Sequence, residues 1–308
     1  MEGGAILSFT IKQIRYFIAT SDFGQVSRAA VELNVSQSAM TAAISQLEEI
    51  LGFELFIRNS HGVSLTRDGE QFLHHARTIV GAVNDAIRMP KKAPDTLKGE
   101  INLGVSYTVM GYFLPPLLLR FQRAYPEIEI KITESHRQVV ETSVADGPLD
   151  CGLILTSNLV NTSDLSYELL VRSQRRLWVA SGHELLKANK VKFSDIARQP
   201  YIALNVDEAW HTARRYWSNV AAAPTPLLET SSVEAVRTLV GAGLGVTILS
   251  DMVYRPWSLD GQRIETIEID EPVPSMDVGF VWSGSRVANP AAQVFLSFLK
   301  RTLKHGSS

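Results

Sequence analysis

The sequence predicts an α/β protein that carries a separate, mostly helical domain before the α/β part. Apolar residues recur at helical spacing over about the first 90 positions, and strand and helix patterns alternate from residue 99 onward. A stretch with two prolines, residues 90–98, separates the two regions. The chain has 308 residues, of which 45% are hydrophobic, so it is long enough for more than one domain with a substantial core.

Residues 27–56 predict two short helices joined by a tight turn, a helix-turn-helix. The apolar stripes are Ala29, Ala30 and Leu33 on the first helix, and Val35, Met40, Ile44 and Leu47 on the second. Because these stripes face inward, the outer faces stay free. The second helix begins with the small polar residues Ser36, Gln37, Ser38 and Thr41. Such groups can meet phosphate oxygens or base edges in a major groove, so double-stranded DNA is the first partner to consider.

A wing and a long helix follow. Residues 54–58 and 63–66 predict two short strands, with Ser60, His61 and Gly62 at the polar turn between them. Residues 66–89 lack proline and predict one amphipathic helix. Its apolar seam consists of Phe72, Ala76, Ile79, Val83 and Ile87. A narrow seam of this kind needs a partner, most simply the same helix of a second subunit, and packing within one domain is the alternative. Residues 90–98 then predict a hinge.

Two α/β lobes are expected beyond the hinge. The first set of elements comprises strands at 101–105, 128–132 and 151–155 with helices at 113–124 and 139–145. The second set comprises strands at 176–180, 227–229 and 244–249 with helices at 207–220 and 233–241. The chain returns through strands at 264–269 and 278–282 to a final helix at 290–303. This order predicts two crossovers between a first lobe, about 99–160 and 269–305, and a second lobe, about 161–268.

The ordered set of motifs resembles the LysR-type transcriptional regulators over nearly the whole chain. The segments that carry the resemblance are the first helix at 11–19, the helix-turn-helix at 27–56, the wing at 55–73 with Thr66 and Gly69, and Gly-Ala-Gly-Leu-Gly-Val-Thr-Ile-Leu at 241–249. The resemblance implies a winged helix-turn-helix (1–65), a linker and dimerisation helix (66–89), the hinge, and an effector-binding domain (99–308) with the type II fold of periplasmic binding proteins. It implies a sequence-specific regulator of transcription that responds to a small molecule bound between the lobes.

The resemblance also implies partners. The linker helix would form a homodimer, and two dimers a homotetramer, on a promoter operator; RNA polymerase is left open as a further partner. The residues expected at the DNA are Ser27, Ser36, Gln37, Ser38, Thr41, Arg58, Ser60 and His61. Many family members carry proline, arginine and glutamine where this chain has Ser38, Ala42 and Ala43, so the operator preference cannot be taken from relatives. Basic and acidic residues balance between 10 and 67, so the phosphate contacts must come from local placement and dimerisation.

The effector is expected at strand ends and helix starts, where free N–H groups favour a polar or anionic ligand. The residues expected to bind it are Ser106, Thr108, Ser135 and His136 on one wall, and Asn205 and Thr247 on the other. The alternative is that the serines and Thr108 only cap helices, and that Thr247 is an ordinary strand residue. Arg137, Arg175 and Arg176 can each pair with a carboxylate, although a solvated surface position is the usual role of such arginines.

Composition and motifs exclude several other classes. The net charge of −2 and the absence of 18 consecutive apolar residues argue against a membrane protein, and the start lacks a secretory signal, so the cytoplasm is expected. The single cysteine, Cys151, favours an inert buried thiol over a redox sensor. His74 and His75 have no further ligands at metal spacing, and no cofactor is expected. Gly241–Gly245 lacks a phosphate-loop lysine, and no nucleophile elbow occurs, so an enzyme is disfavoured. A cytoplasmic small-molecule-binding module without regulatory output would leave the first 90 residues unused.

Overall fold

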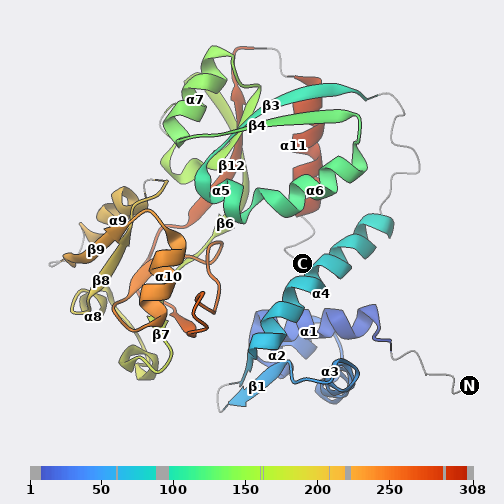
Figure 1. Cartoon of the computed structure of the whole chain (residues 1–308), viewed down its shortest axis with the longest axis vertical. Helices are drawn as coiled ribbons and strands as arrows, with labels where there is room; N and C mark the ends of the chain where they lie inside the picture. The colour runs from blue at the N-terminus through green and yellow to red at the C-terminus, as the bar shows by residue number, and fades with distance from the viewer. Residues whose placement is uncertain are drawn as a thin grey trace, which may run out of the picture. The chain divides into compact units, whose positions relative to one another are not determined.

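The computed structural model describes residues 8–59, 62–87, 97–159, 161, 163–207, 209–218, 223–286 and 289–303. The chain forms two compact units, one within residues 1–92 and the other within 93–308 (Figure 1). Among the described helices, none combines the length and the apolar character that crossing a membrane requires.

The first unit is a winged helix-turn-helix. Its elements are α1 (Ile11–Phe23), α2 (Val26–Glu32), α3 (Gln37–Leu51), β1 (Phe56–Asn59), β2 (Gly62–Leu65) and α4 (Arg67–Ile87). Local signals set the helix ends. Thr10 begins α1 with a capping box, in which its hydroxyl accepts from the Gln13 N–H at 3.2 Å and its own N–H donates to Gln13 Oε1 at 2.7 Å. Gly52 ends α3 in the left-handed conformation, with φ of 78°.

Aromatic and aliphatic side chains from all four helices form the core of this unit. Phe17 is fully buried, and its ring centroid lies 5.3 Å from those of both Phe56 and Phe72. Met40 and Leu47 of α3 are also fully buried, as the sequence predicts. The prediction for Leu33 is wrong, because this residue is 38% exposed. Helix α2 ends at Glu32, so Leu33 has left the helical face that its neighbours bury.

The linker helix α4 packs against its own domain over its first half. Phe72 (8% exposed) and Ala76 (0%) belong to the core of the first unit, and Ile79 packs against it. Within one chain these three side chains therefore follow the alternative to an intersubunit seam, packing within one domain, because α1 and the wing contact this part of α4. Val83 is only partly buried, and the Ile87 side chain lies outside the described residues, as do Ser60, His61 and 88–96 of the linker and hinge.

Gly69 shows why α4 can approach the wing so closely. A Cβ atom at this position would lie 2.2 Å from the carbonyl oxygen of Leu55. The Thr66 hydroxyl donates to the Glu54 carbonyl at 2.7 Å and accepts from the Gly69 N–H at 2.8 Å. The motif at the helix entry thus binds the start of α4 to residues 54–55, directly before the first wing strand.

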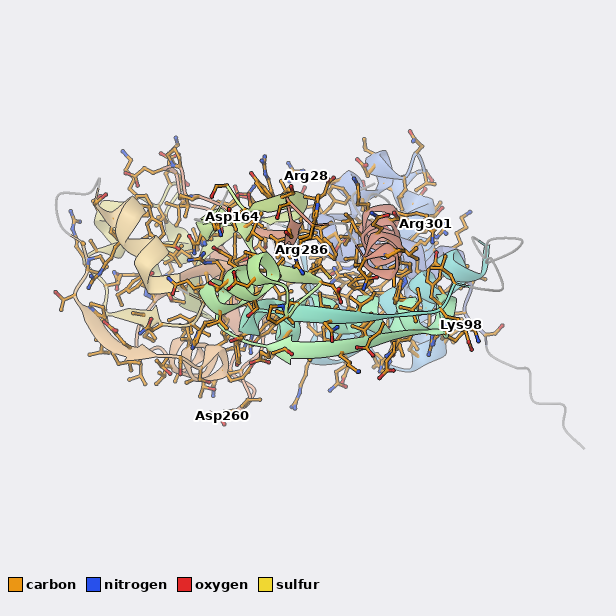
Figure 2. All side chains as sticks on the ribbon, turned by 90° about the horizontal axis from the view of Figure 1, so that it is seen from above. Arg28, Lys98, Asp164, Asp260, Arg286 and Arg301 are labelled. Carbon is orange, nitrogen blue, oxygen red and sulfur yellow. The ribbon has the colours of Figure 1, made fainter. Side chains whose placement is uncertain are left out.

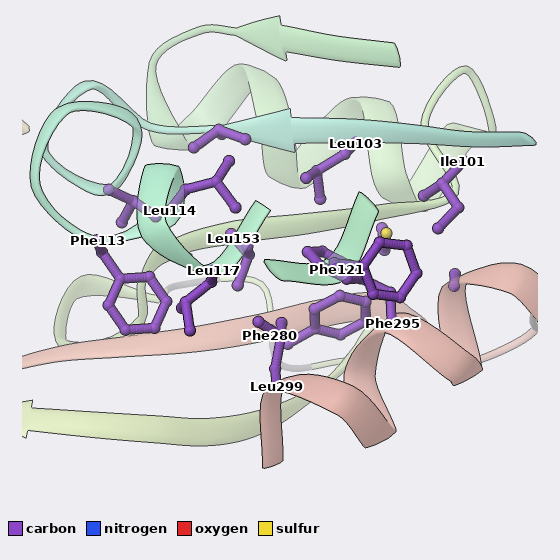
Figure 3. Close-up of a cluster of buried hydrophobic side chains, with 14 of the residues drawn as sticks. Ile101, Leu103, Phe113, Leu114, Leu117, Phe121, Leu153, Phe280, Phe295 and Leu299 are labelled. Atoms are coloured by element: carbon purple, nitrogen blue, oxygen red, sulfur yellow. The ribbon is translucent and has the colours of Figure 1, made fainter. Parts of the chain in front are cut away.

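The first lobe of the second unit is a five-stranded sheet in the order β4-β3-β5-β12-β6. Its strands are β3 (Gly99–Val105), β4 (Ile128–Glu134), β5 (Cys151–Leu155), β6 (Leu165–Ser173) and β12 (Met276–Ser283), of which β12 runs antiparallel to both neighbours. One face carries α5 (Tyr107–Tyr112), α6 (Leu114–Ala124) and α11 (Pro290–Leu303), and the other carries α7 (Arg137–Asp146). The core beneath α6 and α11 is centred on Phe121 and Phe295, whose ring centroids are 4.7 Å apart (Figure 3).

The lobe boundary differs from the prediction. Strand β6, which the sequence pattern does not reveal, pairs with β12, so the first lobe continues to Ser173 instead of ending near residue 160. This is an edge strand whose alternate side chains, Tyr167 (52%) and Leu169 (38%), are exposed, so it lacks the buried run of an inner strand. Cys151, by contrast, is the core thiol that its apolar neighbours predict: it is fully buried, and burial followed by the charge of Asp150 raises its pKa.

The second lobe contains a three-stranded sheet, β10-β7-β11, and a parallel pair, β8-β9, which the bridge between Tyr201 and Val246 connects. Its strands are β7 (Arg175–Ala180), β8 (Tyr201–Leu204), β9 (Pro226–Thr230), β10 (Thr247–Ser250) and β11 (Ile264–Ile267). Its helices are α8 (Phe193–Ile196), α9 (Ala209–Trp217) and α10 (Val233–Gly241), and it has a short 3-10 helix, η2 (Glu184–Lys187). The first lobe has a similar short 3-10 helix, η1 (Thr156–Asn158), after β5. The chain passes between lobes twice, from β6 to β7 and from β11 to β12, as predicted.

Candidate functional site

The start of α3 presents polar side chains to solvent. Ser36 precedes the helix, and its hydroxyl accepts from the Ala39 N–H at 3.2 Å and lies 3.2 Å from the Ser38 hydroxyl. Thr41 donates its hydroxyl proton to the Gln37 carbonyl at 2.9 Å, so only its lone pairs are left for a ligand. The Gln37 side chain is exposed and has no hydrogen-bond partner among the described residues. Gln37 is therefore the group at this helix start that is best able to read a base edge.

Two further predicted DNA contacts flank the helix. Ser27 is exposed on α2 beside Arg28, which Figure 2 labels at the surface. Arg58 is exposed on β1, and it lines a hollow of about 430 Å³ together with Thr41 of α3. The recognition helix and the wing therefore share one surface. Glu48 also lines this hollow, but its carboxylate is engaged, since Oε1 accepts from the Leu55 N–H at 2.8 Å and the Phe56 N–H at 3.3 Å.

A second hollow lies between the two lobes of the other unit. The polar residues on its walls are Thr108 and Asn158 of the first lobe, and Arg175, Asp207, Thr212, Tyr216 and Ser250 of the second. Its volume is about 30 Å³, which has room for one or two water molecules. A larger ligand fits only if the side chains or the lobes around the cavity move.

Side chains of the protein itself hold the lobes closed. The Thr108 N–H donates to Asp207 Oδ2 at 2.6 Å, and the Thr212 hydroxyl donates to Asn158 Oδ1 at 3.0 Å, both across the cavity. Asp207 adopts a positive φ of 46°, an uncommon conformation for a residue with a side chain. A third contact joins the lobes through α5 and α10. The Tyr112 hydroxyl donates to Glu234 at 3.3 Å, and burial followed by the Glu234 charge raises the Tyr112 pKa.

Arg175 brings a positive charge to the cavity wall. It begins β7 directly after the first crossing, and its Nη1 donates to the carbonyl oxygens of Pro274 and, at 2.7 Å, Ser275 on the second crossing. Burial lowers the pKa of the Arg175 guanidinium, although a guanidinium stays protonated in proteins. Among the described residues, no carboxylate forms an ion pair with Arg175.

The predicted effector residues are only partly brought together. Thr108 lines the cavity. Ser106, two residues earlier, is fully buried outside the cavity lining, and its hydroxyl has no partner among the described residues. His136 and Asn205 are exposed, and Ser135 is partly buried with its N–H donating to the Val105 carbonyl at 3.0 Å. Thr247 is buried in β10 opposite Trp178, in the position of an ordinary strand residue. In the described part of the chain, all of the predicted effector residues except Thr108 therefore lie outside the cavity lining.

The sequence pattern does not indicate five of the polar cavity residues: Asn158, Asp207, Thr212, Tyr216 and Ser250. Three of them share one signal, because Asn158, Asp207 and Ser250 lie at or just beyond the carboxyl ends of strands β5, β8 and β10. Ligands of open α/β sheets collect at this edge. Thr212 carries no such signal, since it lies inside α9 and reaches the cavity only through the packing of that helix.

Comparisons with known proteins assign both units of the chain to one family. The family model for the bacterial regulatory helix-turn-helix protein of the lysR family matches residues 11–70, and that for the LysR substrate binding domain matches 94–304. The uncharacterized HTH-type transcriptional regulator YnfL of Escherichia coli is 27% identical, over 97% of this chain and 100% of its own. The HTH-type transcriptional regulator CfxR of Cupriavidus necator is 27% identical over 79% of this chain and 76% of its own. The crystal structure of HinK, a LysR family transcriptional regulator from Pseudomonas aeruginosa, superposes with a TM-score of 0.63 at 25% identity, covering 96% of this chain and 99% of HinK.

Proposed function

Because the chain belongs to the LysR family of transcriptional regulators, we propose that a small polar or anionic effector binds between its two lobes and thereby changes how the protein holds its operator. The observation that carries this proposal is the interlobe cavity, which has polar walls from both lobes and hydrogen bonds across it. An effector can bias the protein only if it binds the closed and parted arrangements with different affinities. A binding module without regulatory output would leave the helix-turn-helix without a role.

We further propose that Gln37 reads a base and that Ser27, Ser36, Ser38, Thr41 and Arg58 contact the DNA around it. Gln37→Ala should weaken operator binding by about 1–3 kcal/mol, because a bidentate amide contact to adenine is lost. Titration of labelled operator DNA at fixed salt measures the change. Gln71→Ala, the same substitution at an exposed site on α4, serves as the matched control. Equal affinities for wild type and Gln37→Ala would assign base reading to another residue.

The carboxyl-terminal half of α4 is proposed to pair two chains through Val83 and Ile87, and pairs of dimers to form the tetramer. Val83→Glu should break the dimer, because a charge without a partner would enter an apolar seam. Operator binding should weaken with it, since two half-sites need two linked heads. Sedimentation velocity over a concentration series measures the dimer, with Gln71→Glu as the control for added charge. A Val83→Glu protein that still sediments as a dimer would move the seam elsewhere.

A further inference from the structure

Two adjacent arginines at the start of β7 have opposite surroundings. Arg176 forms ion pairs with Asp251 at 3.1 Å and Glu268 at 3.8 Å. Arg175 instead lines the interlobe cavity, and its hydrogen bonds go to the neutral carbonyls of Pro274 and Ser275. In the described part of the chain, a carboxylate in direct contact therefore neutralises the charge of Arg176 but not that of Arg175.

The charge of Arg175 is incompletely compensated. A partly buried cation costs free energy unless an anion or several dipoles replace its lost water. Two carbonyl dipoles do so on the Nη1 side. Asp277 adds attraction from a distance, but its own carboxylate accepts from the Ser275 hydroxyl at 2.6 Å and lies 3.6 Å from Arg172 Nε. The Nε and Nη2 donors of Arg175 form no hydrogen bond within the described residues, and together they match the two oxygens of a carboxylate.

We propose that Arg175 is the effector-binding arginine, and that the effector carries an anionic oxygen group, a carboxylate or a phosphate, which pairs with this guanidinium inside the cavity. The inference rests on the proposed function in one respect, that the effector binds between the lobes. It deepens that function by naming the charge of the ligand and the residue that recognises it.

The position of Arg175 also connects the anion to lobe movement. Arg175 follows the first crossing, at Gln174, and binds the carbonyls of the second crossing at Pro274 and Ser275. A ligand that draws the guanidinium therefore acts on both crossings at once. Asp207 lines the same cavity, and its negative charge opposes the entry of an anion. Anion binding thus works against the contact between Asp207 and Thr108 that holds the lobes closed.

Thermal unfolding of the full-length protein tests the proposal at fixed ionic strength. The probes are acetate, benzoate and succinate, each compared with its neutral amide, together with inorganic phosphate compared with chloride. At least one anion should raise the unfolding temperature with saturation, whereas its neutral or chloride counterpart should not. The dissociation constant of that anion should rise at least tenfold in Arg175→Gln. It should stay near wild type in Arg176→Gln, the matched control with the same charge change one residue away.

Arg175→Lys keeps the charge but not the planar guanidinium, so it should bind the anion with intermediate affinity. If Arg175→Gln does not fold, the comparison of Arg175→Lys with wild type tests the proposal. Three results would overturn the proposal: no anion that stabilises beyond its counterpart, wild-type affinity in the Arg175 variants, or equal weakening in Arg176→Gln. Operator binding by the same proteins is measured alongside. A wild-type protein that did not bind operator DNA would contradict the proposed function itself. A wild-type protein that bound operator DNA but recognised no anion would contradict only this inference.

Discussion

Phe72→Ala should destabilise the DNA-binding unit by about 3–5 kcal/mol, the usual cost of truncating a buried phenylalanine. Phe72 is 8% exposed, and its ring centroid lies 5.3 Å from that of Phe17 and 6.0 Å from that of Phe9. All five tryptophans follow residue 177, so tryptophan fluorescence reports on the second unit, whereas circular dichroism reports on both. In urea, the variant should lose helical signal early while the fluorescence transition stays at its wild-type midpoint.

Two further variants separate core packing from dimerisation. Phe72→Leu keeps most of the buried volume, so it should recover much of the lost stability. Val83→Glu should change the sedimentation of the protein but leave the early helical transition of a monomer largely intact, because Val83 lies beyond the core of the first unit. If Phe72→Ala retained wild-type stability and lost only the dimer, Phe72 would belong to the intersubunit seam that its spacing first suggests.

Periodicity predicts that a helix forms but not which surface covers it. The predicted bounds of α10 and α11, Val233–Gly241 and Pro290–Leu303, are those of the structure. Both helices have clear local start signals: the Ser232 hydroxyl accepts from the Ala235 N–H at 3.1 Å, and Asn289 Oδ1 accepts from the Ala291 N–H at 2.9 Å. The helical spacing in α4 is equally clear. Yet Phe72 pairs with Phe17, which lies 55 residues earlier, and no local pattern encodes that contact.

The sequence predicts which loops surround the candidate effector site, but not which of their side chains line it. The rule that ligands collect at strand ends predicts Thr108, which lines the cavity. Asp207 and Thr108 meet across 99 residues of chain, because the lobes close on each other. Arg175 looked like a solvated surface arginine, since the sequence cannot show that Arg176 takes the nearby acids and Arg175 faces the cavity. Which charges stay unpaired is a property of the folded chain.

Asp207→Asn should shift the effector domain toward a state with its lobes apart. The hydrogen bond from the Thr108 N–H to Asp207 Oδ2 is 2.6 Å long and charge-assisted, which makes it worth about 1.5–3 kcal/mol. The amide oxygen of asparagine can still accept from the Thr108 N–H. The substitution therefore removes only the charge assistance, about 1–1.5 kcal/mol, which should raise the population of the open state by roughly 5- to 10-fold. Asparagine has a similar shape and tolerates the φ of 46° that Asp207 adopts, so the substitution tests the charge. Hydrogen exchange of α5 amides in the full-length protein measures the change.

Thr212→Val separates movement of whole lobes from local loss of one hydrogen bond. It removes the 3.0 Å contact with Asn158 but leaves the acceptor of the Thr108 N–H in place. If the two contacts open together as the lobes part, the Thr108 amide should exchange faster in this variant too. Thr225→Val, at an exposed site in the second lobe, should leave that rate unchanged. An unchanged Thr108 rate in Thr212→Val would mean that Asp207 releases Thr108 locally, and that this pair does not hold the lobes closed.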